Sequence, residues 1–183
     1  MKMPLDFPSL FPEVELIRDA DLRSGVEAVW QELWQASELE SVHDLVASPE
    51  FPYPHIPHNR AVVQMALAVA STFERFHSVT VDRDLLVAAA LLQDASKLVE
   101  FSRDGDTITY SELGRQYPHA FWAAHVALKH GLPDDVCHII IHHTPQAAKF
   151  PTSLEGKILY YVDQIDVLAI HRDRWRKELI ITK

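Results

Sequence analysis

The feature that most constrains the fold is an apolar run that ends on two polar residues. Residues 85–92 are all leucine, valine or alanine, and Gln93 and Asp94 follow directly. A helix that is apolar on every side belongs at the centre of a domain. A carboxylate at its end is costly to bury unless a cation or hydrogen-bond donors receive it. We therefore predict a central helix over residues 82–95 that delivers Asp94 to a polar site.

Apolar residues recur at helical spacing through most of the chain, which predicts an all-α fold. Further helices are expected over residues 22–33, 41–47, 57–76, 118–131 and 133–143, and from residue 152 or 153 through 168. One short β-hairpin is expected between Val99 and Tyr110, around Asp104-Gly105. Residues 50–57 are rich in proline and predict a loop. Prolines also punctuate residues 1–20, which predict an irregular arm ahead of a single domain at residues 21–183.

Composition narrows the function class. The chain has 183 residues, of which 48% are hydrophobic, so one globular domain with its own core is expected. A net charge of −9 disfavours general binding to nucleic acid or to an anionic membrane, but a local basic pocket can still hold a small anion. Cys137 is the single cysteine, and from the sequence pattern we expect neither a leader nor a membrane span. We expect a cytoplasmic protein with a small-molecule partner, and a homodimer stays open.

Two residues of the central region have both a functional and a structural interpretation. His58 begins the apolar stripe of the helix predicted from Pro57, so it faces the core. A histidine there is more often a hydrogen-bonded core residue than a metal ligand. Asp94 opposes the helix dipole, and Lys97 could neutralise it three residues on.

The second half of the chain adds further candidates. His119 lies in the first turn of its predicted helix. His142 and His143 follow three isoleucines, and adjacent side chains on a helix diverge by about 100°, so one can coordinate while the other contacts substrate. The alternative is that both are exposed at a helix end. Asp163 lies in mid-helix among apolar and aromatic residues, and Asp166, one turn on, could share or replace its role.

The spacing of these candidates is more informative than any one of them. Asp94 to His119 is 25 residues, His119 to His142 is 23, and His142 to Asp163 is 21. Helix–loop–helix units of this length bring such positions to one end of a bundle, where a metal can be held between helices. His125 lies on a different helix face from His119, and only His119 is chosen for the site. Six other histidines are interpreted as surface or structural residues: His43, His55, His77, His130, His138 and His171. The basic run at residues 172–177 is interpreted as a solvated helix end.

These segments resemble the HD-domain superfamily of metal-dependent phosphohydrolases, from about His58 to Leu168. The sequence LLQDASK at residues 91–97 is similar to the family's Leu-Leu-His-Asp-Ile-Gly-Lys segment, with Gln93 in place of the histidine. The family's other histidine and aspartate helices are matched at residues 58–61, 119–128, 139–143 and 159–166. The resemblance implies an HD-like helical bundle.

The resemblance also implies roles for the candidates. His58, Asp94 and Asp163 would hold one metal, and Asp94 would bridge to a second metal held by His119 and His142, with His143 as the alternative ligand. Lys97 would face a substrate phosphate, and Asp94 and Lys97 would form the catalytic pair. One or two ions of Mn, Fe, Co or Ni suit such ligands. The implied reaction is hydrolysis of a small phosphorylated metabolite or nucleotide by metal-activated water.

Gln93 leaves other kinds of site and other functions open, because a neutral amide is a poorer ligand of a transition metal than imidazole. The site could use fewer protein ligands, prefer a harder ion, or have lost its metal. Two alternative functions therefore stay open. The protein could be an HD-fold enzyme of different chemistry, such as a di-iron oxygenase, hydratase or lyase, or a non-enzymatic protein that binds a small ligand.

Overall fold

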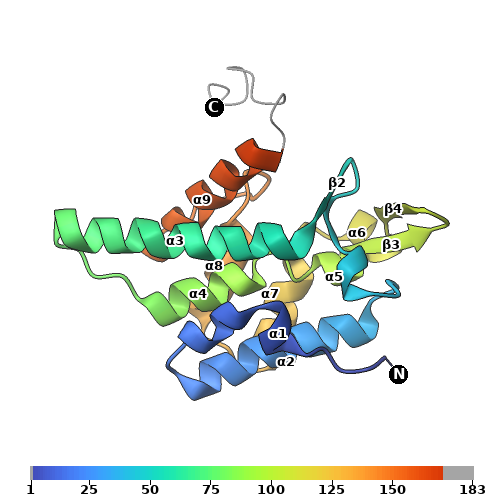
Figure 1. Cartoon of the computed structure of the whole chain (residues 1–183), viewed down its shortest axis with the longest axis horizontal. Helices are drawn as coiled ribbons and strands as arrows, with labels where there is room; N and C mark the ends of the chain where they lie inside the picture. Colours follow the sequence, from blue (N-terminus) through green and yellow to red (C-terminus); the bar gives the residue numbers. More distant parts are fainter. Residues whose placement is uncertain (1, 171–183) are drawn as a thin grey trace.

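The computed structural model describes residues 2–170, and it confirms the all-α class. Helices build the core, and among the described residues the strands form only two antiparallel pairs at its edge (Figure 1). His171 and the basic run at residues 172–177 lie outside the described residues. Within the described part, no helix is both long enough and apolar enough to span a membrane.

The central helix is α4 (Arg83–Leu92), as the apolar run predicts. Residues 86–92 are all buried, and α4 packs against α2 (Ala20–Ala36), α3 (His55–His77), α8 (Asp134–His142) and α9 (Leu154–Ile170). Figure 1 shows α3 and α9 on one side of α4 and α2 on the other. The Asp82 side chain caps its start by accepting a hydrogen bond from the Leu85 N–H at 3.0 Å.

The C-terminal end of α4 is fixed by side chains from two neighbouring helices. Trp30 Nε1 on α2 donates to the Leu91 carbonyl at 2.9 Å, and Asn59 Nδ2 on α3 donates to the Ala90 carbonyl at 3.2 Å. These bonds satisfy carbonyls that have no partner inside a helix that ends at Leu92. The prediction that the helix continues to Ala95 is wrong, because residues 93–96 form turns after α4 ends at Leu92.

The N-terminal residues, which were expected to be irregular, form two short helices that pack into the core. They are α1 (Phe7–Leu10) and the 3₁₀ helix η1 (Pro12–Leu16). Each helix has a proline at its start, where the missing N–H costs nothing, so these prolines begin helices instead of preventing them. Phe7 and Phe11 are buried, and their rings lie 5.8 Å and 4.8 Å from the Trp30 ring.

The predicted hairpin is present as β3 (Phe101–Asp104) and β4 (Thr107–Tyr110), which pair in register around Gly105. It starts two residues later than expected, because Val99 and Glu100 belong to the short helix α5 (Lys97–Glu100). A second, unexpected pair joins β1 (Val46–Ser48) to β2 (Phe51–Pro54). It follows a short 3₁₀ helix η2 (Val42–Asp44), where a longer helix was predicted. Prolines are tolerated in β2 because a two-stranded sheet has only edge strands.

The remaining helices are α6 (Glu112–Gln116) and α7 (Phe121–Lys129), and α7 packs on α2 and α8. The α7 helix begins later than Pro118, because Ala120 has a φ of 69° and breaks the helical backbone. His119 therefore lies in a turn before α7 and not in its first turn. Gly131, with a φ of 74°, follows the end of α7, and the Ser153 hydroxyl caps the start of α9 through the Gly156 N–H.

Candidate metal centre

Asp94 lies in the turn after α4, and its buried carboxylate is surrounded by nitrogen atoms. Its two oxygens are approached by Lys97 Nζ at 2.7 Å, His119 Nε2 at 3.0 Å, His55 Nε2 and His58 Nε2 each at 3.4 Å, and His143 Nε2 at 3.6 Å. Burial acts to raise the pKa of Asp94, but Lys97, His119 and His143 outweigh it and hold that pKa well below its usual value. The carboxylate at the end of the apolar helix is thus charged and received by potential cations.

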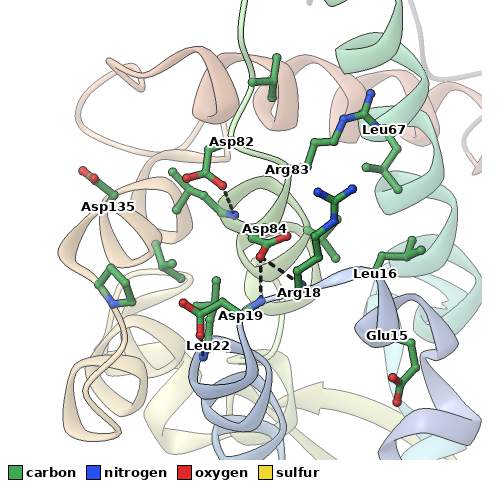
Figure 2. A pocket seen from close by; sticks show the side chains of 15 residues that line it. Glu15, Leu16, Arg18, Asp19, Leu22, Leu67, Asp82, Arg83, Asp84 and Asp135 are labelled. Atoms are coloured by element: carbon green, nitrogen blue, oxygen red, sulfur yellow. Dashed lines mark hydrogen bonds between the residues drawn. The ribbon is translucent and has the colours of Figure 1, made fainter.

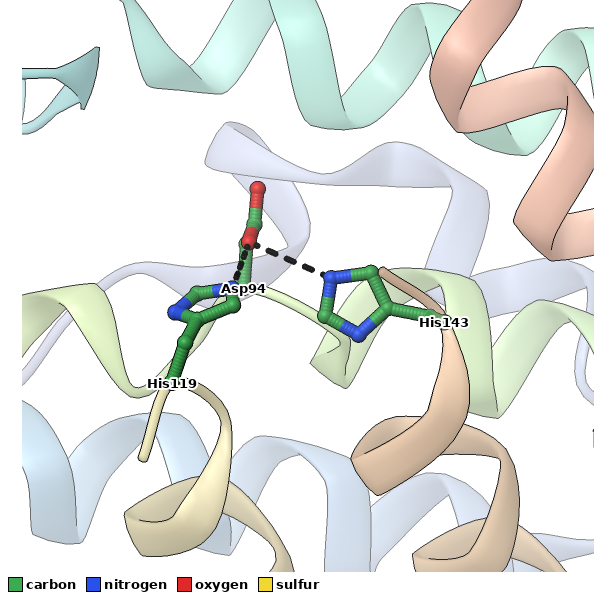
Figure 3. A group of neighbouring side chains, drawn as sticks. All are labelled: Asp94, His119 and His143. Atoms are coloured by element: carbon green, nitrogen blue, oxygen red, sulfur yellow. Dashed lines mark hydrogen bonds and ion pairs between the residues drawn. The ribbon is translucent and has the colours of Figure 1, made fainter. Parts of the chain in front are cut away.

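Two groups of potential metal ligands share Asp94. One consists of His58, Asp94 and Asp163, and the other of Asp94, His119 and His143. In each group, one ligand atom per residue lies within 4.8 Å of the others. Figure 3 shows His119 and His143 converging on the Asp94 carboxylate from two different segments of the chain. The shared carboxylate is the arrangement expected of a bridge between two ions.

Three of the histidines are fixed so that their Nε2 atoms face this centre. The Nδ1 atom of His58 lies 2.6 Å from Asp166 Oδ2, that of His119 lies 2.7 Å from Glu100 Oε2, and that of His143 lies 2.7 Å from the Ile140 carbonyl. An Nδ1–H that donates to an oxygen leaves the Nε2 lone pair free for a metal. The three rings are therefore oriented as metal-binding histidines commonly are.

The carboxylates also raise the proton affinity of two of these rings. Burial acts to lower the pKa of His119, but Glu100 and Asp94 outweigh it and raise the pKa to about 9. Burial is likewise outweighed at His58, where Asp163, Asp166 and Asp94 raise the pKa well above its usual value. Positive charge is thus favoured at this centre, either as protons or as a metal ion.

Two buried side chains at the centre have polar atoms without hydrogen-bond partners among the described residues. In His55 these atoms are the two ring nitrogens, and in Gln93 the atom is Oε1. Burial lowers the pKa of His55 to about 4, despite the neighbouring Asp94. The Nε2 atom of Gln93 donates weakly to Asp163 Oδ1 at 3.5 Å. Buried polar atoms without partners are rare in proteins, so this donor set fits a site that receives a cation.

The structure brings together most of the residues singled out in the sequence. His58, Asp94, His119 and Asp163 converge, Lys97 binds Asp94, and Asp166 holds the His58 ring. His142 is the exception: its Nδ1 atom lies 2.7 Å from the His138 carbonyl, and it belongs to neither ligand group in the described chain. His143, the alternative that the sequence left open, lies beside Asp94 instead: α8 ends at His142, and the Nε2 atom of His143 lies 3.6 Å from Asp94 Oδ1.

Sequence reasoning missed two residues of this centre, His55 and Glu100. His55 was interpreted as a surface or structural residue, yet it is fully buried beside Asp94. Its spacing of three residues from His58 places both on one helix face and could have revealed it. Glu100 carries no comparable local signal, since it meets His119 only through the tertiary structure.

The centre opens into a pocket of about 810 Å³. Ligand-group residues line it together with Lys97 and Glu100, and other parts of its wall are Phe101, Tyr110, Thr144, Gln146 and Gln164. A second cavity, of about 740 Å³, lies between α2, α4 and α8 (Figure 2). There Asp84 accepts hydrogen bonds from the backbone of Arg18 and Asp19, and Asp82 caps α4. Those carboxylates have structural roles, so the first pocket is the candidate site.

The helical fold and the shared histidine–aspartate centre define the class of this protein. The chain belongs to the HD domain family, whose model matches residues 56–168. It is similar to the dihydroneopterin 2',3'-cyclic phosphate phosphodiesterase of Methanocaldococcus jannaschii, with 31% identity over 113 residues. The match covers 61% of this chain and 45% of that relative, so the chain spans less than half of the relative's length in the alignment. No solved structure matches the chain.

Proposed function

We propose that this protein is a metal-dependent phosphohydrolase acting on a small phosphorylated metabolite or nucleotide. The observation that carries the proposal is the sharing of Asp94 by two ligand groups beside Lys97, in a pocket open to a small molecule. Membership of the HD domain family and the phosphodiesterase name of the M. jannaschii relative support the same class of reaction.

The residues divide into two candidate ion sites. His58, Asp94 and Asp163 would hold one divalent ion, and Asp94, His119 and His143 would hold a second. Mixed imidazole and carboxylate ligands suit Mn, Fe, Co or Ni. Bound ions of this kind activate water and neutralise the charge that develops on a phosphate under attack. In this arrangement His143, and not His142, is the proposed ligand.

The other polar residues of the pocket would position the substrate and the ligands. Lys97 Nζ donates to Asp94 Oδ2, and an ammonium has three donors, so two are left for phosphate oxygens. Glu100 and Asp166 hold the rings of His119 and His58 in place. Such outer partners of metal-binding histidines fix the ring orientation and make the ligand more basic.

The pocket is of a size that fits a nucleotide-like substrate. Its volume lies within the range of roughly 300–1,000 Å³ that is common for small-molecule sites. Phe101 and Tyr110 line it at the hairpin, where aromatic rings can contact a planar base or pterin. Because the relative acts on a cyclic phosphate, we place 2',3'-cyclic phosphodiesters beside phosphomonoesters among the substrates to test first.

The first test is elemental analysis of the protein purified without added metal, followed by phosphate-release assays on nucleotides, sugar phosphates and cyclic phosphodiesters. We expect a bound transition metal and turnover that a chelator abolishes. Asp94→Asn is expected to remove activity, because it would lose a ligand of both ions. Hydrolysis that is unchanged by chelation and metal-free purification would contradict the proposal, and turnover that requires oxygen would assign a different chemistry.

A matched pair of variants tests whether His143 or His142 is the metal ligand. His143→Ala is expected to lower activity and metal affinity by at least about tenfold, the lower end of the loss seen when even an outer partner is removed. His142→Ala should retain nearly the parent values, because that ring contacts its own helix. A larger loss of activity and metal affinity in His142→Ala than in His143→Ala would show that His142 is the ligand.

A further inference from the structure

We infer that His55 is an additional protein ligand of the ion held by His58, Asp94 and Asp163, and that it supplies the imidazole missing at Gln93. The inference rests on the proposed metal centre and concerns which residues complete it. Gln93 stands beside Asp94 where the resemblance to the family calls for a histidine. His55 is the one further imidazole that contacts the same carboxylate within the described chain.

The position of His55 places it on the correct side of Asp94. It is the first residue of α3, and His58 lies three residues later on the same helix face. The Nε2 atoms of His55 and His58 both lie 3.4 Å from a single atom, Asp94 Oδ2. Both imidazoles thus approach the same oxygen of Asp94, and His58 shares a ligand group with that carboxylate, so His55 lies on the side of Asp94 that would face the His58 ion.

The surroundings of His55 favour ligation over a purely structural role. Its side chain is fully buried. Its Nδ1 atom has no partner among the described residues, and its Nε2 atom has only the 3.4 Å contact with Asp94 Oδ2, without a hydrogen bond. The other three histidines at the centre each have Nδ1 held by an oxygen. A buried polar group without a hydrogen-bond partner is destabilising, and coordination of a cation would give one of the two ring nitrogens a partner.

The His55 ring is also free to complete the site. It belongs to neither compact ligand group of the described residues, so coordination would require its ring to turn toward the ion. No oxygen holds its Nδ1 atom, and its ring packs against Trp30 at a centroid distance of 6.0 Å. Gln93 cannot substitute for it effectively, because an amide oxygen donates less strongly than imidazole to a transition metal.

Gln93 and His55 should therefore be exchangeable, and a double-mutant cycle tests this directly. The variants are His55→Ala, Gln93→His and the double variant, with His142→Ala as the control for loss of a histidine outside the centre. The measured quantity is the Mn²⁺ dissociation constant, obtained by titration calorimetry. X-ray absorption on protein loaded with one equivalent of Co²⁺ counts the imidazoles on the ion.

We expect His55→Ala to weaken Mn²⁺ binding by about 10–100-fold and to remove one imidazole from the Co²⁺ spectrum. Gln93→His should restore both in the His55→Ala background, with a smaller effect in the parent. The control should bind like the parent. Thermal unfolding of the metal-free variants checks folding, and His55→Phe, which fills the same space against Trp30, replaces His55→Ala if the alanine variant does not fold.

Three results would overturn the inference. Unchanged Mn²⁺ affinity in both His55 variants would exclude His55 as a ligand and leave the hydrolase proposal intact. Weaker binding with an unchanged imidazole count and no rescue by Gln93→His would show that His55 only orients Asp94. Absence of Mn²⁺ and Co²⁺ binding by the parent would overturn this inference and the proposed metal centre together.

Discussion

At the scale of single residues, the centre is organised by one carboxylate and the groups that neutralise it. Asp94 is buried, yet its pKa lies well below the usual value, because Lys97 and several imidazoles offset the effect of burial. Glu100 and Asp166 act one step further out by raising the proton affinity of His119 and His58. The carboxylates of this centre therefore favour protons on His119 and His58 wherever a metal ion does not take their place.

Metal binding should compete with these protons. A ligating imidazole must be neutral at the nitrogen that binds, and the pKa of His119 is raised to about 9. The protonated form thus prevails near neutral pH, so Mn²⁺ binding should release protons and tighten as the pH rises towards about 9. Titration calorimetry in buffers of different ionisation enthalpy measures the proton release.

The control for this prediction is Glu100→Gln, which keeps an acceptor for His119 but removes the charge that raises its pKa. This variant should release fewer protons near neutral pH. Binding of Mn²⁺ that weakens as the pH rises from about 6.5, the ordinary pKa of histidine, towards 9 would contradict the competition.

At the scale of elements, the segment from α5 to the start of α7 places His119. Ser96 Oγ accepts the Ala123 N–H at 2.6 Å, and Glu100 Oε1 accepts the Ala120 N–H at 3.0 Å. These bonds hold a backbone in which Ala120 has a positive φ, a conformation that costs a non-glycine residue of order 1–3 kcal/mol. The proposed ligand role of His119 thus depends on a junction between two helices.

Gly114 on α6 tests this junction. A Cβ atom at this position would lie 2.2 Å from the Glu100 carbonyl oxygen, which is backbone and cannot rotate away. Gly114→Ala should therefore lower the free energy of unfolding by about 1–3 kcal/mol. It should also weaken metal binding, because Glu100 and His119 move with the backbone. Urea unfolding and Mn²⁺ titration measure the two effects.

Gly25→Ala is the matched control for Gly114→Ala. Its Cβ atom would meet the end of the Leu132 side chain, which can adjust, and Gly25 lies in α2 outside the ligand groups. This variant should retain the metal affinity of the parent. A Gly114→Ala protein with the stability and affinity of the parent would show that the junction tolerates movement.

At the scale of the whole molecule, the core extends beyond the region that matches the family. The family match begins at residue 56, but Phe7 and Phe11 are buried against Trp30, whose indole N–H binds the end of α4. The first helices therefore support the helix end that carries Asp94. The N-terminal residues are part of the domain and not an arm outside it.

Phe11→Ala measures this contribution. Loss of a fully buried phenylalanine should lower the free energy of unfolding by about 3–5 kcal/mol. Leu16→Ala, in the same segment but about half exposed, should change it by no more than about 0.5 kcal/mol. Urea unfolding gives both values. Equal small effects would mean that residues 2–17 do not contribute to the cooperative core.

The sequence alone determined the features that follow from local pattern. The apolar run at residues 85–92 predicted the central helix, because an element without a polar face must be buried. Helical spacing predicted α2, α3 and α9, and Asp104-Gly105 predicted the turn of the β3–β4 hairpin. The intervals between Asp94, His119, His142 and Asp163 predicted a common site, and the structure brings all of them except His142 to the Asp94 carboxylate.

Only the tertiary structure decided which neighbouring side chains enter that site. His142 and His143 are adjacent in the sequence, and the end of α8 turns one towards its own helix and the other towards Asp94. His55 became a candidate ligand because α3 packs against α4, and Glu100 became a partner of His119 through the α5–α7 junction. The period of the apolar residues predicts which face of a helix or strand is buried. The residues that this face contacts depend on packing between segments far apart in the chain.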